Sequence, residues 1–433
     1  MATLESLRRS SGRNWMRAIL LTAALLFLSF TTLSALPAQA ARHASQSNCS
    51  ECIDTSSLKN AYDYAIGATR LWNEKPYLQG QGVTVAVVDS GIAREKDFKG
   101  ADGRSRLLAN VSFVGEQGAS DHYGHGTHVA GLVGGNGASS GGAYVGVAPQ
   151  VNLVNVKVSD SKGMGSTKDV VAGLQWVYEH RKQYNIRVVN LSLDSSESES
   201  YHLSPLDAAL EILWFNRIVV VVSAGNSGSR GIRYPPANDP FVVTVGAMDD
   251  RGTASTNDDV LASFSPYGKT QDHMAKPDLV APGTNLISVF PDNGATLARE
   301  HPDHVVTEHY FRMSGTSMSA AVTAGAAALL LQAQPNLTPD QVKYRLMNLA
   351  EPYRSKSLKT GYLNIYDAVH SSTTLPANLG LLPSHLLQTG SSPATWTSVN
   401  WDSVNWDSVN WDSVNWDSVN WDSVNWDSNY WGP

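Results

Sequence analysis

Four apolar runs rich in β-branched residues constrain the fold of this chain more than any other feature. They lie at 83–91, 151–158, 187–193 and 217–225, and each ends at turn residues. Because their apolar character is nearly continuous rather than alternating, we expect strands that are buried on both faces. Buried strands of this kind form parallel sheets, which need helices on both sides.

Helical patterns separate and follow these runs. The segment 166–183 carries an apolar stripe at helical spacing, and 320–334 has the composition of an apolar helix. Two further segments, 204–216 and 338–350, open with Ser or Thr followed by Pro, which is a helix start signal. We therefore predict an α/β domain over 61–372, with three layers and a mostly parallel central sheet covered by helices on both faces.

The first 40 residues have the pattern of a secretory signal peptide. Four arginines precede a short apolar run at 18–30, and an Ala-x-Ala site ends at Ala40. An uncleaved membrane anchor is the alternative, but the apolar run is short for a membrane span. We predict general export, cleavage after Ala40 and a secreted, extracellular protein.

The only cysteines, Cys49 and Cys52, lie in the N-terminal segment 41–60. A zinc site needs about four ligands, and no second pair exists to supply them. We expect a small local disulfide in an oxidising compartment, or no role at all.

The C-terminal part has a different composition. Residues 373–395 resemble a linker, and in 396–433 Trp recurs every five residues, with five perfect copies of "WDSVN" at 401–425. This low-complexity repeat also holds six Asp and no Lys or Arg, against a net charge of −7 for the chain. The rest therefore has no basic field for nucleic acid.

So many tryptophans cannot be buried in so short a module, so most of them must meet another copy, a glycan surface or the α/β domain. The alternative is an association-prone tail without a ligand. We predict attachment to the cell envelope or self-association through the repeat.

Candidate reactive residues lie where the predicted strands end. Asp89 ends the first strand and Asn226 the strand at 217–225. Ligands bind at the carboxyl ends of parallel strands. Ser317 follows Gly315 at the start of the apolar helix, where free backbone N–H groups and the helix dipole stabilise an oxyanion.

These residues lie in motifs that resemble those of the subtilisin-like serine proteases. The four segments are "VVDSGI" (87–92), "HGTHVAG" (125–131), "SAGN" (223–226) and "GTSMSAA" (315–321). They follow the family's order of Asp, His and Ser, and the resemblance extends over about 80–372. It implies a subtilisin-like fold and hydrolysis of peptide bonds.

The resemblance also implies a role for each residue. Ser317 is the nucleophile, His125 the general base and Asp89 the residue that orients His125. The Asn226 side chain and the Ser317 N–H form the oxyanion hole. The residues implied in substrate binding are Ser192, Leu193, Asp194, Gly165, Ala224 and Gly225.

The histidines near this site need not act together. We expect His128 to be structural and His122 to be solvated, because glycines at 124 and 126 prevent the three rings of this motif from converging on a metal ion. A second group, His301, His304, Glu308 and His309, is interpreted as a flexible rim of the substrate groove. No cofactor is required for the chemistry, and structural calcium, for instance near Asp97, stays open.

Two positions depart from the family pattern. Ala321 stands where Pro is usual, which we expect to alter only the first helical turn. Asp194 stands where Gly is common beside the pocket for the P1 residue, the one whose carbonyl is attacked. An acid there favours basic or polar side chains, narrows the pocket, or points to water.

The sequence therefore predicts a secreted serine endopeptidase acting on protein or peptide substrates. A serine esterase or peptide ligase on the same scaffold uses the same groups and is an alternative. A surface-attachment protein that acts through its Trp repeat is another, although such a protein has no need of the full set of reactive residues.

Overall fold

The computed structural model describes residues 49–116, 118–195, 197–228, 231–353, 360–387, 394–401 and 404. The chain divides into two units, Met1–Ser50 and Glu51–Pro433, and the fold below is that of the second. The predicted signal peptide at 1–40 and most of the repeat lie outside the described residues. Both cysteines, Cys49 and Cys52, are disulfide-bonded, in agreement with the first of the two expectations for them.

A ten-stranded sheet forms the centre of the described residues, in the order β14-β15-β10-β6-β5-β4-β1-β3-β2 with β7 paired to β6. The longer strands are β1 (Thr84–Asp89), β2 (Leu107–Ser112), β3 (Asn152–Lys157), β4 (Ile186–Leu191), β5 (Val219–Ser223), β6 (Val243–Asp249) and β10 (Leu279–Pro282). These pair in parallel throughout. The antiparallel pairs of this sheet each include a short strand: β7 (Val260–Leu261) pairs with β6, and β14 (Glu351–Pro352) pairs with β15 (Gly361–Tyr362).

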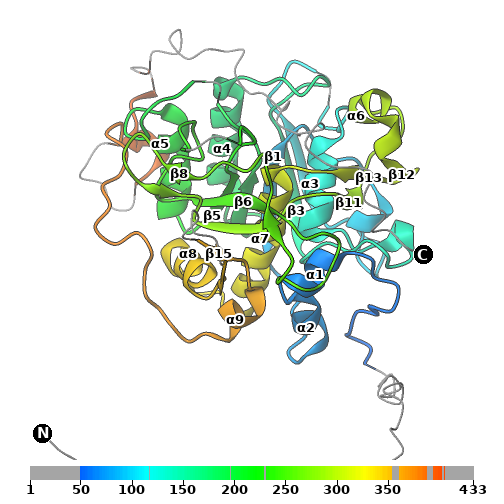
Figure 1. The fold of residues 1–433 in the computed structure, drawn as a ribbon. Helices are drawn as coiled ribbons and strands as arrows, with labels where there is room; N and C mark the ends of the chain where they lie inside the picture. The colour runs from blue at the N-terminus through cyan, green and yellow to red at the C-terminus, as the bar shows by residue number, and fades with distance from the viewer. Residues whose placement is uncertain are drawn as a thin grey trace, which may run out of the picture. The chain divides into compact units, whose positions relative to one another are not determined.

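Helices cover both faces of this sheet, as the sequence predicts (Figure 1). On one face α3 (His125–Gly134) packs against α7 (Thr316–Ala333), and on the other α4 (Thr167–His180) packs against α5 (Pro205–Phe215). The other helices are α1 (Ala61–Ala65), α2 (Ala68–Asn73), α6 (Thr296–Glu300), α8 (Pro339–Asn348) and α9 (Ile365–His370). The 3-10 turns are η1 (Lys96–Phe98), η2 (Ala138–Ser140), η3 (Pro302–His304) and η4 (Trp396–Ser398).

Two small sheets complete the fold of the described residues. One pairs β8 (Gly268–Lys269) with β9 (Ala275–Lys276). The other has the order β11 (Leu286–Val289), β13 (Tyr310–Met313) and β12 (Val305–Thr307), and β11 packs against α3.

The residues predicted to start helices form capping hydrogen bonds in the structure. The Ser204 side chain accepts from Asp207 N at the start of α5, which has Pro at its first position. At the start of α8, Thr338 and Gln341 form a complete capping box. Each side chain satisfies a backbone N–H that has no partner within its helix.

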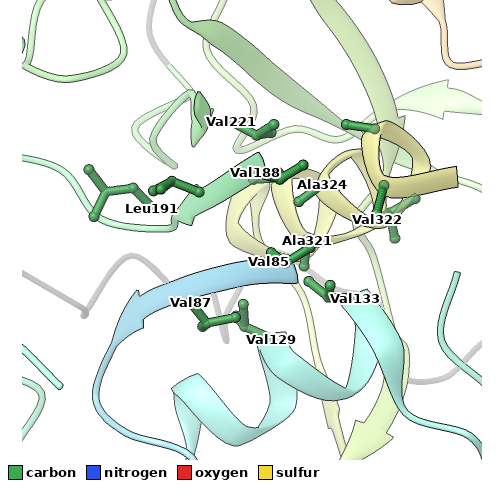
Figure 2. Close-up of a cluster of buried hydrophobic side chains, with 14 of the residues drawn as sticks. Val85, Val87, Val129, Val133, Val188, Leu191, Val221, Ala321, Val322 and Ala324 are labelled. Atoms are coloured by element: carbon green, nitrogen blue, oxygen red, sulfur yellow. The ribbon is translucent and has the colours of Figure 1, made fainter. Parts of the chain in front are cut away.

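Helix α7 lies in the core. By length and composition it resembles a membrane-spanning helix, but 89% of that apolar window is buried inside the protein. Figure 2 shows Ala321 and Ala324 of α7 beside the valines of β1, β4 and α3. The helix begins at Thr316 rather than at the predicted 320, so Ser317 lies within its first turn.

Strand β1 lies where the connections change direction along the sheet. It pairs with β3 on one side and with β4 on the other. In open parallel sheets a ligand crevice forms beyond the carboxyl ends of the strands at such a point. Asp89 is the last residue of β1, so the fold places it at that crevice.

The chain after 372 packs on the α/β domain over 373–387 and 394–401, which we call the C-terminal strap. Arg345 Nε of α8 donates to Thr373 O over 2.8 Å, and Ser384 N donates to Glu211 Oε2 of α5 over 2.7 Å. Where described, the stretch predicted as a linker is thus held by specific hydrogen bonds. Its backbone groups bond to side chains of α8 and α5. Composition does not reveal such contacts between segments that are distant in sequence.

The first residues of the Trp repeat belong to this strap. The Trp396 side chain is buried, with its ring centroid 5.9 Å from that of Tyr178 of α4. Trp401 stacks on Trp396 with centroids 4.9 Å apart and donates its indole N–H to the Trp396 carbonyl. One copy of the repeat is therefore anchored on the α/β domain.

The N-terminal helices contact α9 near the other end of the domain. Ile365 N donates to Ile66 O over 3.0 Å, and Tyr366 OH donates to Glu74 Oε2 over 2.8 Å. The guanidinium carbon of Arg70 lies 3.3 Å from the centroid of the Tyr366 ring, a cation–π contact. These contacts join segments about 300 residues apart.

Candidate active site

Asp89 and His125 form a buried pair at the end of β1. His125 Nδ1 donates to Asp89 Oδ1 over 2.8 Å, with Oδ2 at 3.1 Å. Burial raises the pKa of Asp89, and the adjacent His125 opposes that rise. Since a carboxylate only accepts hydrogen bonds, the pair fixes the proton on Nδ1 and leaves the lone pair of the imidazole on Nε2.

A further carboxylate, Asp121, holds the segment that carries His125. It is buried and accepts five hydrogen bonds: from Ser90 Oγ, Tyr123 N and Gly124 N on one oxygen, and from Thr127 N and Oγ1 on the other. Asp121 therefore supplies acceptors to the N-terminal turn of α3. Its role was not predicted from the sequence, although an Asp shortly before a helix start is a recognisable capping signal.

The other two histidines of this motif do not converge with His125. His128 is buried, and its Nε2–H donates to the carbonyls of Leu286 and Phe311, each over 3.1 Å. Burial, followed by the nearby His125, lowers the pKa of His128 to about 3, so it stays neutral. His122 is exposed. The structural and solvated positions predicted for these two residues are confirmed.

Ser317 and Asn226 lie together at the start of α7. Asn226 Oδ1 accepts from Thr316 N over 2.9 Å and from Thr316 Oγ1 over 3.1 Å, which orients the amide. Its Nδ2 is buried and has no hydrogen-bond partner among the described residues. A buried donor without a partner is rare in proteins and indicates a ligand site. The Ser317 N–H belongs to the first helical turn, which has no acceptor within the helix.

The residues expected to bind substrate lie mainly along two neighbouring segments. Ser192 follows β4 and is joined to Ser317: Ser317 Oγ donates to Ser192 O over 3.4 Å, and Ser192 Oγ to Ser317 O over 3.2 Å. Ala224 and Gly225 follow β5, and Gly225 O accepts from Thr316 Oγ1 over 3.0 Å. The structure therefore brings these three predicted residues beside Ser317.

Two other predicted pocket residues contribute differently. Leu193 is buried and its side chain belongs to the hydrophobic core, so the side chain does not line a substrate pocket. Gly165 follows β3, where a Cβ would lie 2.3 Å from Val158 O. Close backbone packing thus explains a glycine at 165, whatever its part in binding.

The described residues contain no group of three or more His, Cys, Asp or Glu side chains placed to hold a metal ion. Asp97, where calcium was left open, is already engaged by protein groups. Its Oδ1 accepts from Tyr310 OH over 2.6 Å, and its backbone carbonyl accepts from Arg106 Nη2 over 2.6 Å. These contacts give no support to a cation at this position.

The second histidine group is part of ordered secondary structure rather than a flexible rim. His304 is buried and donates from Nδ1 to Arg312 O over 3.1 Å, and His309 lies 3.3 Å from Glu95. Each of these two rings thus has its own protein partner. The prediction of a flexible segment was wrong because the pairing of β13 with β11 and β12 is not visible in so short a pattern.

Comparison with known proteins agrees with this geometry. Residues 80–372 match the model of the subtilase family, the peptidase S8 family. The chain belongs to this family. It is 40% identical over 309 residues to the serine protease AprX of Bacillus subtilis (strain 168), covering 69% of this chain and 67% of that relative. It is also 36% identical over 282 residues to subtilisin Savinase of Lederbergia lenta, covering 65% of this chain and 88% of that relative.

A solved structure also resembles the chain. A cold-adapted subtilisin-like serine proteinase matches with a TM-score of 0.52 and 31% identity, over 67% of this chain and 93% of that protein. The fold is therefore subtilisin-like, as the motifs imply. The chain is a subtilisin-like serine protease, a hydrolase that acts on protein or peptide substrates. Ala321, the departure from the family's Pro, is fully buried within α7.

Proposed function

We propose that this subtilase is a secreted serine endopeptidase whose catalytic triad is Asp89, His125 and Ser317. The oxyanion hole consists of Asn226 Nδ2 and the backbone N–H of Ser317. The observation that carries this proposal is the amide donor of Asn226, which has no protein partner among the described residues and lies at the start of α7 beside Ser317. Helix α7 packs against α3, whose first residue, His125, is paired with the buried Asp89.

In the proposed reaction, Ser317 Oγ attacks the carbonyl carbon of the scissile peptide bond while His125 Nε2 accepts the hydroxyl proton. The tetrahedral oxyanion receives hydrogen bonds from Asn226 and from the Ser317 N–H. His125 then gives its proton to the leaving amine, and a water molecule hydrolyses the acyl-enzyme by the same steps. Asp89 stabilises the imidazolium that forms in between.

The assignment is tested with the full chain and a Ser317→Ala variant. We expect the wild type to hydrolyse casein and to be labelled at Ser317 by a phenylmethylsulfonyl reagent, with loss of activity. Ser317→Ala should lose at least about 10³-fold in kcat while keeping its melting temperature. Labelling at another serine, or undiminished activity of the variant, would contradict the assignment.

The same assay separates the alternatives. A p-nitrophenyl ester measured beside casein distinguishes an endopeptidase from a serine esterase or peptide ligase, which would turn over the ester and leave casein intact. Both reactions need the same nucleophile, so only the ratio of the two rates discriminates between them.

We further propose that the protein is exported and that its Trp repeat attaches it to a partner. The basic residues, apolar run and Ala-x-Ala site in 1–40 support a cleaved signal peptide. The regular Trp repeat supports attachment to the cell envelope or self-association, and the stacking of Trp401 on Trp396 supports indole contacts between neighbouring copies.

A further inference from the structure

Asp194 lies between the two segments that flank the proposed nucleophile. Strands β4 and β5 are parallel neighbours, so the segments that follow them, 192–194 and 224–226, leave the sheet side by side. A Cβ placed on Gly225 would lie 2.6 Å from Asp194 Oδ2. The carboxyl group therefore reaches across from the first segment to the second.

This carboxyl group has no counter-charge in the described part of the chain. Asp194 forms no ion pair there, and its Oδ1 is shielded from solvent without a hydrogen-bond partner. Burial alone raises the pKa of Asp194 to about 7. The residue as a whole is half-buried, but a carboxyl oxygen that is shielded from solvent is costly unless it is paired, so the presence of Asp194 here needs a reason.

The position of the two segments 192–194 and 224–226, which we call the walls of the slot, supplies that reason. Ser192 is joined to Ser317, and Gly225 to Thr316, so both walls of the slot adjoin the proposed nucleophile. When the scissile carbonyl sits between Ser317 Oγ and Asn226 Nδ2, the side chain on its acyl side enters between these walls. That side chain is the one that meets Asp194.

We propose that Asp194 directs this protease to cleave after arginine or lysine. The inference rests on the proposed function, since it concerns the substrate residue attached to Ser317 in the acyl-enzyme. A long cationic side chain spans the slot with its methylene groups and brings its charge to the carboxylate, and arginine does so through two parallel hydrogen bonds. An uncharged P1 side chain leaves Asp194 Oδ1 shielded from solvent and unpaired. Substrates with such a side chain are therefore disfavoured.

The test compares three peptide p-nitroanilides that differ only in the P1 residue: arginine, its neutral isostere citrulline, or leucine. For the full-length wild type we expect kcat/KM for arginine to exceed that for citrulline by about 10- to 100-fold. In Asp194→Asn this ratio should fall to within about threefold of unity. Glu197→Gln, which neutralises an exposed acid on the same segment, is the matched control and should leave the ratio unchanged.

The pH dependence gives a readout that needs no variant. A carboxyl group with a raised pKa is neutral below that value and charged above it. The arginine-to-citrulline ratio of the wild type should therefore rise as pH increases through about 7. Any effect of His125 on turnover cancels in the ratio, because both substrates use the same base.

The outcomes separate this inference from the assignment of the reaction. Equal turnover of arginine and citrulline by the wild type would overturn the P1 proposal and leave the triad standing. So would faster turnover of a fourth p-nitroanilide, with alanine at P1, than of the arginine substrate, which would mean that Asp194 only narrows the slot. Loss of all three activities in Ser317→Ala supports the triad irrespective of the ratio.

Discussion

Asn226 uses only half of its amide group within the protein. The oxygen accepts two hydrogen bonds from Thr316, while the nitrogen is buried and lacks a partner among the described residues. The two bonds to oxygen determine which way the amide faces, so the donor is oriented before a substrate binds. A donor fixed in advance needs no reorganisation when charge develops on the substrate, which makes it effective in catalysis.

Replacing Asn226 with Leu should lower kcat by about 10²–10³ while changing KM little, because the lost hydrogen bond forms only in the transition state. This magnitude is the one known for the equivalent donor of subtilisin itself. Steady-state kinetics on a neutral p-nitroanilide peptide would measure it. Asn257→Leu, at an exposed asparagine, serves as the control. A change confined to KM would argue against an oxyanion role.

For individual residues, the sequence predicted those site groups that lie in recognisable motifs. Asp89 and His125 pair as expected, and Asn226 lies against the start of the helix that carries Ser317. Asp121 was not predicted, because its role depends on how a loop folds back on Ser90 and on the first turn of α3. One aspartate in a sequence does not reveal which five hydrogen-bond donors will surround its carboxylate.

Helix α3 depends on one polar residue, Asp121, for the position of its first turn. Asp121 joins Ser90, just after β1, to the first turn of α3, so it connects the two elements that bring Asp89 and His125 together. Every group facing its two oxygens is a donor. An NH2 group in place of Oδ1 would oppose three donors, and one in place of Oδ2 would oppose two.

Asp121→Asn should cost about 1–3 kcal/mol of unfolding free energy and about 10- to 100-fold in kcat, since His125 moves with the start of α3. Thermal unfolding and peptide turnover measured on the same samples would check both effects. Asp102→Asn, at an exposed aspartate, is the control. Full activity in Asp121→Asn would show that the remaining contacts of α3 suffice to hold His125.

The sequence predicted the main elements better than the small ones. The four predicted strands appear within two residues of their expected ends, because buried parallel strands need long apolar runs. The β11–β13 sheet was missed because its strands have only three or four residues, and β11 and β13 are separated by 20 residues that include α6 and η3. The start of α7 was placed too late because its small polar residues, Thr316 to Ser319, do not look like part of an apolar helix.

For the whole molecule, the contacts of the C-terminal strap predict that the stability of a truncated chain depends on where it stops. Stopping the chain after Ser372 removes the donor to Glu211 Oε2 and the buried Trp396, whereas stopping after Val404 keeps both. Removing the partner of a buried polar group and a large buried side chain is destabilising. The two truncations therefore separate the strap from the rest of the repeat.

We expect the shorter chain to unfold about 5–10 °C below the full-length protein and the longer one within about 2 °C of it. At about 20 °C both should turn over a short peptide within a fewfold of the full chain, because neither removes a proposed catalytic residue. Differential scanning calorimetry and a peptide assay would decide. Identical melting temperatures for the two truncations would mean that the strap contributes nothing to stability.

The contacts between the N-terminal helices and α9 also bear on the order in which the domain is completed. Ser317 completes the set of proposed catalytic groups, yet Ile365 and Tyr366, which bond to Ile66 and Glu74, are synthesised almost fifty residues later. Closing a contact across such a length of chain is slow compared with forming local helices. A growing chain thus possesses every reactive group before its two ends are joined. The junction between its two ends is therefore the last part of the domain to form.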